Sequence, residues 1–404
     1  MDLKVILKSR QHPSELLRER ERNRALTQSV LDRQKIAVVG PFPPIRSGIA
    51  KHTEAVARAF EAREDIEVRR WGFSKQYPAV LYPGGSERDI VKGAQTSGVA
   101  ESLSGPNPLT WRRTAREIQL WNPSTLIMPA WTFAVAPALG WIARQVSASS
   151  SKVCMIVHNA YDHESHRLKD RLTSWQLSAA DRFVTHNIAL AKELETRFPE
   201  KPAKVFPHPT FDDVPVATGQ LARRSKLELL FFGLVRPYKG LDILLDAMSL
   251  VTRDDVSLTI AGEFWQHQEE TQARIDRLGP DHSVELLARY VGDDEMAELF
   301  DRADAVVLPY RSVSGSGVVS LAFHYQKPII ASDLPGFAEI LRASGAGWLF
   351  KTGDAADLAA TIDRLGRDDL AGASEAAGRS ARELTWSKFV SMILCDDENA
   401  GAKI

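Results

Sequence analysis

Apolar residues along the chain gather in short runs that alternate with amphipathic stretches. Such runs, bounded by glycine, proline and polar residues, are typical of buried strands. A first set comprises KIAVV (35–39), IEVRRW (66–71), TLIMP (125–129), VCMIV (153–157), RFVTH (182–186) and KVFPH (204–208). A second set comprises LELLFF (227–232), VSLTIAG (256–262), VELLARYV (284–291), DAVVLP (304–309), KPIIAS (327–332) and GWLF (347–350).

The helical stretches between these strands indicate parallel sheets of the α/β class. Strand–helix alternation of this kind builds doubly wound domains. The stretch PTFDDVPVATGQLARRSK (209–226) interrupts the alternation and is typical of a linker. We therefore expect two Rossmann-like domains that face each other across a cleft, one over residues 35–213 and one over 214–383.

Residues 1–34 differ from the rest of the chain. They hold eight basic and five acidic residues, and Pro13-Ser14-Glu15 resembles a helix start. Two interpretations stay open for this charged helical extension. It is a solvated helix, or it docks on a membrane surface or a protein partner.

Composition narrows the class of protein. The chain has 404 residues, is 44% hydrophobic and 25% charged, and carries a net charge of −1. This charge argues against broad nucleic-acid binding. The only cysteines, Cys154 and Cys395, are far apart in sequence, so no zinc or disulfide framework is expected. No apolar run reaches the roughly 18 residues that span a bilayer, and we expect a cytoplasmic protein, peripheral at a membrane if residues 1–34 dock there.

The segment LLFFGLVRPYKGLDILL (229–245) predicts a ligand site. A buried strand is followed by a loop with Arg236 and Lys239, and then by an amphipathic helix. Open α/β sheets bind ligands at the carboxyl ends of strands. A guanidinium and an ammonium there suit a diphosphate, although two solvated loop cations are the plain alternative.

A second loop points to the same kind of ligand. In DAVVLPYRSVSGSGVVSLAFHYQKPIIAS (304–332), a strand is followed by a Ser/Gly loop and by a helix that starts at about Val318. The backbone amides of Ser316, Gly317 and Val318 would then lie at a helix amino terminus, which favours an anion. The alternative is a flexible connection.

The order of several motifs resembles the retaining glycosyltransferases of family 4, which have the two-Rossmann-domain (GT-B) fold. The resemblance covers about residues 35–390. Its motifs are GPFPPIRSGIAKHTEAVARAF (40–60), IVHNAYDHE (156–164), AADRFVTHN (179–187), VFPHP (205–209), FFGLVRPYKGLD (231–242), LTIAGEFW (258–265), LFDRADAVVLPYRS (299–312) and TWSKFV (385–390). The last resembles a terminal segment that crosses back to the first domain, so we expect residues 384–404 to do so.

The resemblance implies a nucleotide-sugar donor on the second domain and an acceptor on the first. Arg236 and Lys239 match the cations that neutralise the donor diphosphate, and Ser47 and Gly48 match the loop that approaches the donor from the other side. These cations make a metal ion unnecessary, and no cofactor is implied beyond the donor itself. The acceptor would be a sugar, a lipid-linked sugar or a small molecule.

The segment after the strand VCMIV is implied to be catalytic, through His158 and Asn159. In the family, a histidine at this place contacts the transferred sugar, often at its 6-hydroxyl, whereas a lone histidine is more often structural. His163 and Glu164 are expected to reach the acceptor, and a surface pair is an equal alternative.

One departure from the family concerns two glutamates that are usually eight positions apart. The first contacts the transferred sugar and the second holds the ribose. An ungapped match places Val313 and Leu321 there, and a shift by one residue gives Ser314 and Ala322. A later family glutamate, which braces the fold, matches Glu339.

These observations favour a retaining, metal-independent glycosyltransferase that uses a nucleoside-diphosphate sugar and a hydroxyl acceptor. The alternative is a non-catalytic binding or scaffold protein, because the glutamate pair is missing. A sugar-nucleotide epimerase or a phosphorylase on a similar fold is a further class. A dinucleotide oxidoreductase is disfavoured, because the strand KIAVV is followed by GPFPPIRSG and not by GxGxxG.

Overall fold

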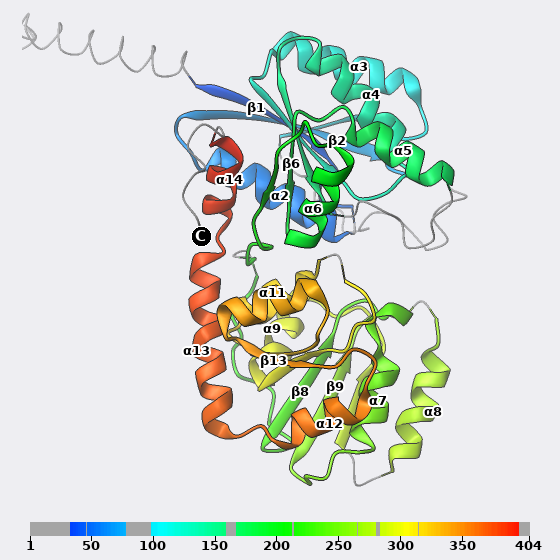
Figure 1. Ribbon diagram of the computed structural model, residues 1–404, viewed down its shortest axis with the longest axis vertical. Helices are drawn as coiled ribbons and strands as arrows, with labels where there is room; N and C mark the ends of the chain where they lie inside the picture. The colour runs from blue at the N-terminus through cyan, green and yellow to red at the C-terminus, as the bar shows by residue number, and fades with distance from the viewer. Residues whose placement is uncertain are drawn as a thin grey trace, which may run out of the picture.

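The computed structural model describes residues 33–45, 47–77, 98–158, 167–211, 214–264, 266–279, 283–313 and 315–395. Over these residues the chain forms two α/β domains that lie one above the other (Figure 1). The predicted fold class is confirmed. The charged extension that the sequence predicts lies almost wholly outside the described residues.

The N-terminal domain is built on a seven-stranded parallel sheet with the order β3-β2-β1-β4-β5-β6-β7. Its strands are β1 (Gln34–Gly40), β2 (Ile66–Lys75), β3 (Val99–Ser104), β4 (Thr125–Ala130), β5 (Lys152–Val157), β6 (Arg182–Thr185) and β7 (Ala203–Val205). Its helices are α2 (Gly48–Glu61), α3 (Pro108–Trp121), α4 (Ala136–Ser147), α5 (Arg167–Leu177) and α6 (Ile188–Arg197). The strand order reverses between β1 and β4, where sheets of this kind bind ligands.

The C-terminal domain has a six-stranded parallel sheet with the order β10-β9-β8-β11-β12-β13. Its strands are β8 (Leu227–Phe232), β9 (Val256–Ala261), β10 (Ser283–Leu287), β11 (Ala305–Leu308), β12 (Ile329–Ser332) and β13 (Gly347–Phe350). Its helical elements are η2 (Pro237–Lys239), α7 (Leu241–Met248), α8 (Gln268–Leu278), α9 (Asp293–Arg302), α10 (Gly317–His324), α11 (Pro335–Ser344), α12 (Ala355–Asp363) and α13 (Arg367–Glu383). Here the order reverses between β8 and β11, the strands before the two predicted phosphate loops.

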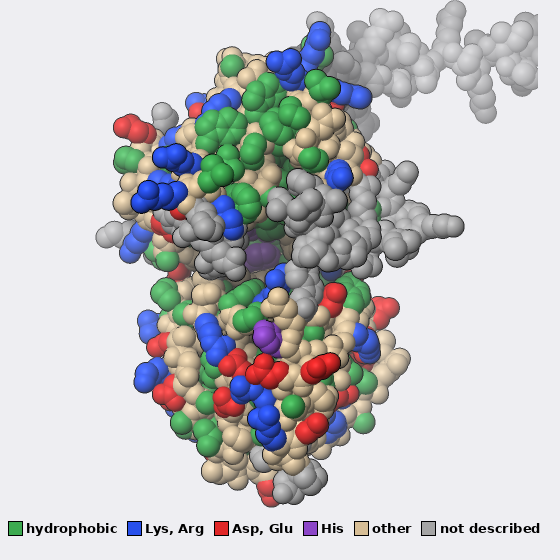
Figure 2. Space-filling view, turned by 90° about the vertical axis from the view of Figure 1, so that its right-hand side faces the viewer, with side chains coloured by type: hydrophobic (Ala, Val, Ile, Leu, Met, Phe, Trp, Pro, Cys, Tyr) green, Lys and Arg blue, Asp and Glu red, His purple; other side chains and the backbone are tan. Residues whose placement is uncertain are grey.

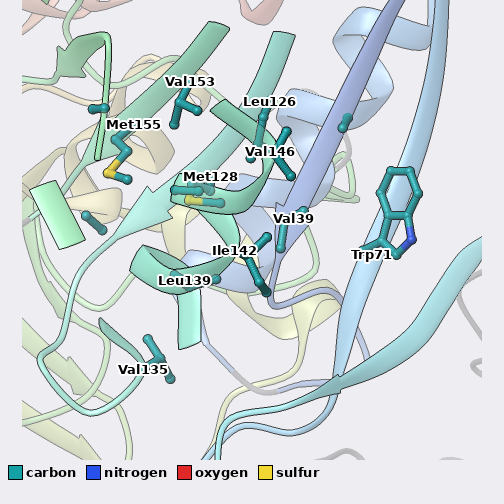
Figure 3. Packing of buried hydrophobic residues seen from close by; sticks show 14 of the residues in the cluster. Val39, Trp71, Leu126, Met128, Val135, Leu139, Ile142, Val146, Val153 and Met155 are labelled. Atoms are coloured by element: carbon teal, nitrogen blue, oxygen red, sulfur yellow. The ribbon is translucent and has the colours of Figure 1, made fainter. Parts of the chain in front are cut away.

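Both faces of each sheet are covered by apolar side chains, as a parallel sheet requires. Figure 3 shows one such layer, in which Leu139, Ile142 and Val146 of α4 pack toward Leu126 and Met128 of β4. In the other domain, α7 and α12 cover one face of the sheet, while α9, α10 and α11 cover the other. These layers fix the strand ends that carry the site.

Helix α14 (Trp386–Leu394) returns the chain to the N-terminal domain. Figure 1 shows α13 along the side of the C-terminal domain and α14 beside α2. Its apolar residues recur at helical spacing, and Trp386, Phe389 and Val390 pack with Phe60 in one buried cluster. The C-terminal end of the chain therefore contributes to the core of the first domain.

Two elements differ from the sequence-based prediction. Strand β3 has the sequence VAESLS and its burial is partial, so no continuous apolar run marked this edge strand. The run predicted as a strand over 284–291 leaves the sheet after Leu287, where its parallel pairing with β9 ends. In the described part of the chain, no helix is both long enough and apolar enough to cross a membrane.

Candidate functional site

The two loops predicted to bind phosphate are held together at the carboxyl edge of the second sheet. The backbone N–H of Arg311 donates to the carbonyl of Tyr238 at 2.7 Å. The Arg311 guanidinium also forms two hydrogen bonds with the Asp242 carboxylate, at 2.8 and 2.6 Å. Gly240 has a φ of +66°, and a Cβ there would lie 1.9 Å from the carbonyl oxygen of Pro309. The loops after β8 and β11 thus form one surface.

Lys239 is buried within this surface, with 7% of the residue exposed. Its ammonium occupies the space that Gly233 leaves, because a Cβ on Gly233 would lie 3.2 Å from the Lys239 Nζ. The same Cβ position is 3.6 Å from a methyl group of Val318, so the ammonium lies near the start of α10. The Lys239 Nζ is also 5.6 Å from the ring centroid of the buried Tyr310.

No described carboxylate compensates the charge on Lys239. Burial lowers the pKa of the Lys239 ammonium to about 8, and repulsion from Arg236 lowers it further in the same direction. Within the described ranges, no carboxylate forms an ion pair with Lys239. Two neighbouring cations with one of them buried create a site that an anionic ligand would stabilise.

The amino terminus of α10 lies beside this ammonium. Ser316 is the N-cap residue, with extended backbone and no side-chain capping bond, and Gly317 begins the helix. The first N–H groups of a helix have no partner inside it, so those of Gly317 and Val318 can donate to a ligand. Gly315 adds room, because a Cβ there would meet no atom within 4 Å.

The predicted residues of the N-terminal loop have different environments. The Ser47 hydroxyl accepts a hydrogen bond from the Ala50 N–H at 3.0 Å and so caps α2. Gly48 is open, since a Cβ there would meet no atom within 4 Å. On the next turn of α2, Lys51 pairs with Asp293 of α9 at 3.3 Å, and this contact joins the two domains.

Four histidines meet where the first domain faces the second. His52 comes from α2, while His158, His186 and His208 follow β5, β6 and β7. The ring centroid of His52 lies 4.6, 5.0 and 5.2 Å from those of His158, His186 and His208. A signal for this cluster is present in the sequence, because His186 and His208 each come shortly after a strand, in the segments VTHN and FPHP, but the sequence analysis identifies only His158 as a site residue.

Hydrogen bonds define the state of these imidazoles. The His186 Nδ1 lies 2.9 Å from the carbonyl oxygen of Phe206, so this nitrogen carries a proton and donates it. The His186 Nε2 then accepts from the His52 Nε2, at 2.9 Å. The backbone N–H of His158 donates to the Ala130 carbonyl at 2.9 Å, and the buried His158 Nε2 has no hydrogen-bond partner among the described residues.

All four histidines are neutral near pH 7. Burial, followed by repulsion from His208, lowers the pKa of His158 to about 3. Burial lowers the pKa of His208 to about 4, although a hydrogen bond to Pro209 opposes this shift. The pKa values of His52 and His186 also lie well below the usual value, chiefly because of burial.

Three of these imidazoles have a spacing that could hold a metal ion. Donor atoms of His52, His158 and His186 all lie within 4.8 Å of one another. Neutral imidazole is the form that binds zinc and related ions. The Nε2 atoms of His52 and His186 are, however, engaged with each other in a hydrogen bond.

A pocket between the domains connects the histidine cluster with the donor loop. Its walls are formed by His186, Asn187, Pro207, His208, Val313, Gly315, Ser316, Val319, Gly336, Phe337, Glu339 and Ile340. The Ser320 hydroxyl of α10 lies 2.8 Å from the His208 Nδ1. A Glu339 carboxylate oxygen accepts from the Ile188 N–H at 3.1 Å. Figure 2 shows a hollow at the waist of the molecule with a histidine side chain on its floor.

Several predicted residues lie outside the described part of the chain. These are Asn159, His163 and Glu164, and also Ser314 of the Ser/Gly loop. Of the two positions where the family has glutamates, Val313 lines the interdomain pocket and Leu321 packs beside the buried clusters of both domains. No carboxylate is therefore present at either position.

Comparison with known proteins places the second domain in a family. Residues 226–368 match the family described as "Glycosyl transferases group 1". The solved structures that resemble the chain include a protein from Anabaena in complex with UDP and glucose, with a TM-score of 0.69, 15% identity, and coverage of 90% of this chain and 99% of that one. Sucrose-phosphate synthase from Thermosynechococcus elongatus has a TM-score of 0.65 at 16% identity, over 89% and 97% of the two chains. At these identities the structures establish the fold alone.

Similar sequences include a GDP-mannose:glycolipid 4-beta-D-mannosyltransferase from Xanthomonas campestris pv. campestris, 28% identical over 56% of this chain and 66% of that protein. A phosphatidyl-myo-inositol mannosyltransferase from Mycobacterium leprae is 34% identical over 43% and 48%. A D-inositol 3-phosphate glycosyltransferase from Actinosynnema mirum is 24% identical over 82% and 86%. The first two matches span only about half to two thirds of those relatives. The chain therefore has the two-domain GT-B fold, and its second domain matches the group 1 glycosyltransferase family, in agreement with the resemblance to family 4.

Proposed function

We propose that the protein transfers a sugar from a nucleoside-diphosphate sugar to a hydroxyl group of an acceptor, with retention of configuration and without a metal ion. The donor would bind to the second domain and the acceptor to the first. The names of the relatives include a glycolipid, a phosphatidylinositol and an inositol phosphate acceptor. We therefore propose a lipid-linked sugar or a small polyol as the acceptor class, and an enzyme in the cytoplasm or at the membrane periphery.

The observation that supports this proposal most directly is the environment of Lys239. A buried ammonium without a carboxylate partner in the described ranges lies near the amino terminus of α10 and beside Arg236. The two loops that carry these groups are fixed to each other by Arg311. A diphosphate would gain two side-chain cations and the N–H groups of a helix start at one place.

These groups would act on the step in which the bond between the anomeric carbon and the diphosphate oxygen breaks. The electron pair of that bond moves to the leaving diphosphate, so negative charge increases there as the bond lengthens. Arg236, Lys239 and the N–H groups of Gly317 and Val318 would stabilise this charge. The neutral His158, whose Nε2 has no hydrogen-bond partner among the described residues, would form a hydrogen bond to a sugar hydroxyl.

A second candidate for the stereochemical course of the transfer is inversion of configuration at the anomeric carbon. The name of one relative states a beta linkage in the product, and a beta product requires inversion if the sugar of the donor is alpha-linked. The absence of a carboxylate at positions 313 and 321 also departs from the retaining family. Proton NMR of the anomeric region of the product, recorded during turnover with an alpha-linked donor, decides between the two outcomes.

Calorimetric titration with GDP and with UDP tests the donor site. We expect the wild-type protein to bind one of them, and Lys239→Met to weaken that binding by roughly 10- to 100-fold, the range for a lost charge-assisted contact. Lys351→Met is the matched control, because Lys351 is exposed and follows β13 at the same edge of the sheet. A wild-type protein that binds neither nucleotide would contradict the proposal. Binding without turnover would instead favour the non-catalytic alternative.

A further inference from the structure

Glu339 extends from the second domain to the first. It lies on α11, and its Oε2 accepts the backbone N–H of Ile188, the first residue of α6, at 3.1 Å. A carboxylate at the amino terminus of a helix is stabilised by the unpaired N–H groups there. The contact uses one carboxylate oxygen, and the Oε1 of Glu339 makes no hydrogen bond with a described residue.

Among the described residues that line the interdomain pocket, Glu339 is the only carboxylate. The other polar groups around it are the side chains of His186, Asn187, His208 and Ser316. They come from both domains, and Ser316 is the N-cap residue of the helix that we assign to the donor phosphate. The pocket therefore adjoins the place where the sugar of a bound donor would begin.

Val313 lines the same pocket. It occupies one of the two positions where the family resemblance calls for the glutamate that contacts the transferred sugar. The Cγ1 of Val313 would lie 3.4 Å from a Cβ on Gly336, in the first turn of α11. Val313, where the family has a carboxylate, thus lies on the pocket wall opposite α11, the helix that carries Glu339.

On the basis of the proposed function, we propose that Glu339 is the carboxylate that binds the hydroxyl groups of the transferred sugar. Neighbouring hydroxyls of a hexose donate to a carboxylate in short, charge-assisted hydrogen bonds. The pocket holds about 40 Å³, which admits hydroxyl groups but not a sugar ring. The ring would lie at the mouth of the pocket, and the negative charge of Glu339 would also favour positive charge on the ring as the donor bond breaks.

Glu339→Gln separates this role from the role of a brace between domains. The amide oxygen of glutamine can still accept the Ile188 N–H, so the bridge persists while the negative charge is lost. We expect an unchanged melting temperature and unchanged affinity for the nucleoside diphosphate. The affinity for the sugar nucleotide should fall by roughly 10- to 100-fold. The probes are GDP with GDP-mannose and UDP with UDP-glucose, measured by calorimetry on the full chain.

Val313→Glu in the Glu339→Gln background supplies the second variant. It returns a carboxylate to the same pocket from the other wall, and should restore part of the lost affinity for the sugar nucleotide. Glu375→Gln, on the exposed side of α13, is the matched control and should behave like the wild type.

The outcomes are distinct. A selective loss for the sugar nucleotide, with partial rescue by Val313→Glu, supports the inference. It is overturned if Glu339→Gln binds both ligands as the wild type does, or if it loses both affinities in step with its melting temperature. A wild-type protein that binds no nucleoside diphosphate contradicts the proposed function itself, and this result is obtained before any variant is made.

Discussion

The Nε2 atoms of His52 and His186 lie 2.9 Å apart in the buried junction between the two domains. Because the His186 Nδ1 donates to the Phe206 carbonyl, the hydrogen bond between the two rings requires a proton on His52 and a lone pair on His186. A proton added to His186 would place two donors against each other. The packing of this junction therefore depends on neutral histidines.

The first prediction is a loss of stability in weak acid. Burial places the pKa of His158 at about 3 and that of His208 at about 4, against about 6.5 in the unfolded chain. The unfolded state thus binds more protons between these values, so stability is full above pH 6.5 and falls as the pH decreases. Each such histidine contributes a slope of about 1.4 kcal/mol per pH unit. Chemical denaturation at several pH values between 7 and 4.5 measures it.

His208→Gln should show a shallower decrease than the wild type, because one buried titrating group is removed. The control is His267→Gln, since the His267 side chain is 59% exposed. Equal slopes in His208→Gln and the wild type would mean that the cluster does not govern acid stability.

The second prediction is that Lys239→Met stabilises the free protein while it weakens donor binding. The folded-state pKa of Lys239 is lowered from 10.5 to about 8. Folding therefore opposes the charged form, and the cost is fully present below pH 8 and is relieved as the pH rises toward 10.5. Methionine removes this cost, so unfolding at pH 7 should require up to about 3 kcal/mol more. Lys351→Met should change neither quantity. A destabilised Lys239→Met would show that the ammonium has a partner in the folded protein.

Much of the fold follows from local sequence signals. The strands β1, β4, β5 and β8 contain continuous apolar runs because parallel strands are buried on both faces. The loops with Arg236 and with Gly317 were predictable because they follow such strands, and ligands bind at those ends. The edge strand β3 was not predictable, since its exposed face needs no apolar residues.

The interdomain part of the site could not be derived in the same way. His52 lies on a helix more than a hundred residues from His158 and His186, and only the folded sheet brings the three together. The role of Glu339 also depends on a contact to α6 from another domain. The spacing of residues within one segment carries no information on contacts between distant segments. Lys239 and Gly233, in contrast, belong to one loop, so their proximity is expected from the sequence.

The third prediction concerns this loop. Gly233 has a φ of +97°, and a Cβ there would lie 3.2 Å from the Lys239 Nζ. Gly233→Ala should therefore destabilise the protein by roughly 1–3 kcal/mol through backbone strain and should weaken nucleotide binding by displacing the ammonium. Gly372→Ala, in a helix where a Cβ meets no atom within 4 Å, should instead be neutral or slightly stabilising. Full nucleotide affinity in Gly233→Ala would separate Lys239 from the diphosphate site.

The fourth prediction is that nucleotide binding and sugar transfer persist in excess chelator. Two side-chain cations and a helix start would neutralise the diphosphate, so no divalent ion is required there. Rates are measured after dialysis against EDTA, and then with added magnesium, manganese or zinc. Activity that disappears with chelator and returns with one of these ions would contradict metal independence. A rise in melting temperature with zinc alone would point to the three histidines whose donor atoms lie within 4.8 Å.

The last prediction concerns His158, whose imidazole is neutral at physiological pH and whose Nε2 has no hydrogen-bond partner among the described residues. His158→Ala should reduce the transfer rate far more than it weakens the affinity for the nucleoside diphosphate. Removing a contact to the transferred sugar that strengthens in the transition state lowers the transfer rate. Removing a contact to the nucleotide instead lowers the affinity for the nucleoside diphosphate. The measurement combines melting temperature, nucleoside-diphosphate affinity and initial rate on one purified variant.

The neighbouring His52 provides the comparison for that experiment. It is 1% exposed and its Nε2 is hydrogen-bonded to His186, so His52→Ala should lower the melting temperature, and its rate should follow the loss of folded protein. His158→Ala should lower the rate without lowering the melting temperature to the same extent, because the His158 Nε2 forms no hydrogen bond with a described residue. If both variants lose rate only in step with stability, His158 is a structural member of the cluster, and contact with the sugar must come from elsewhere in the cleft.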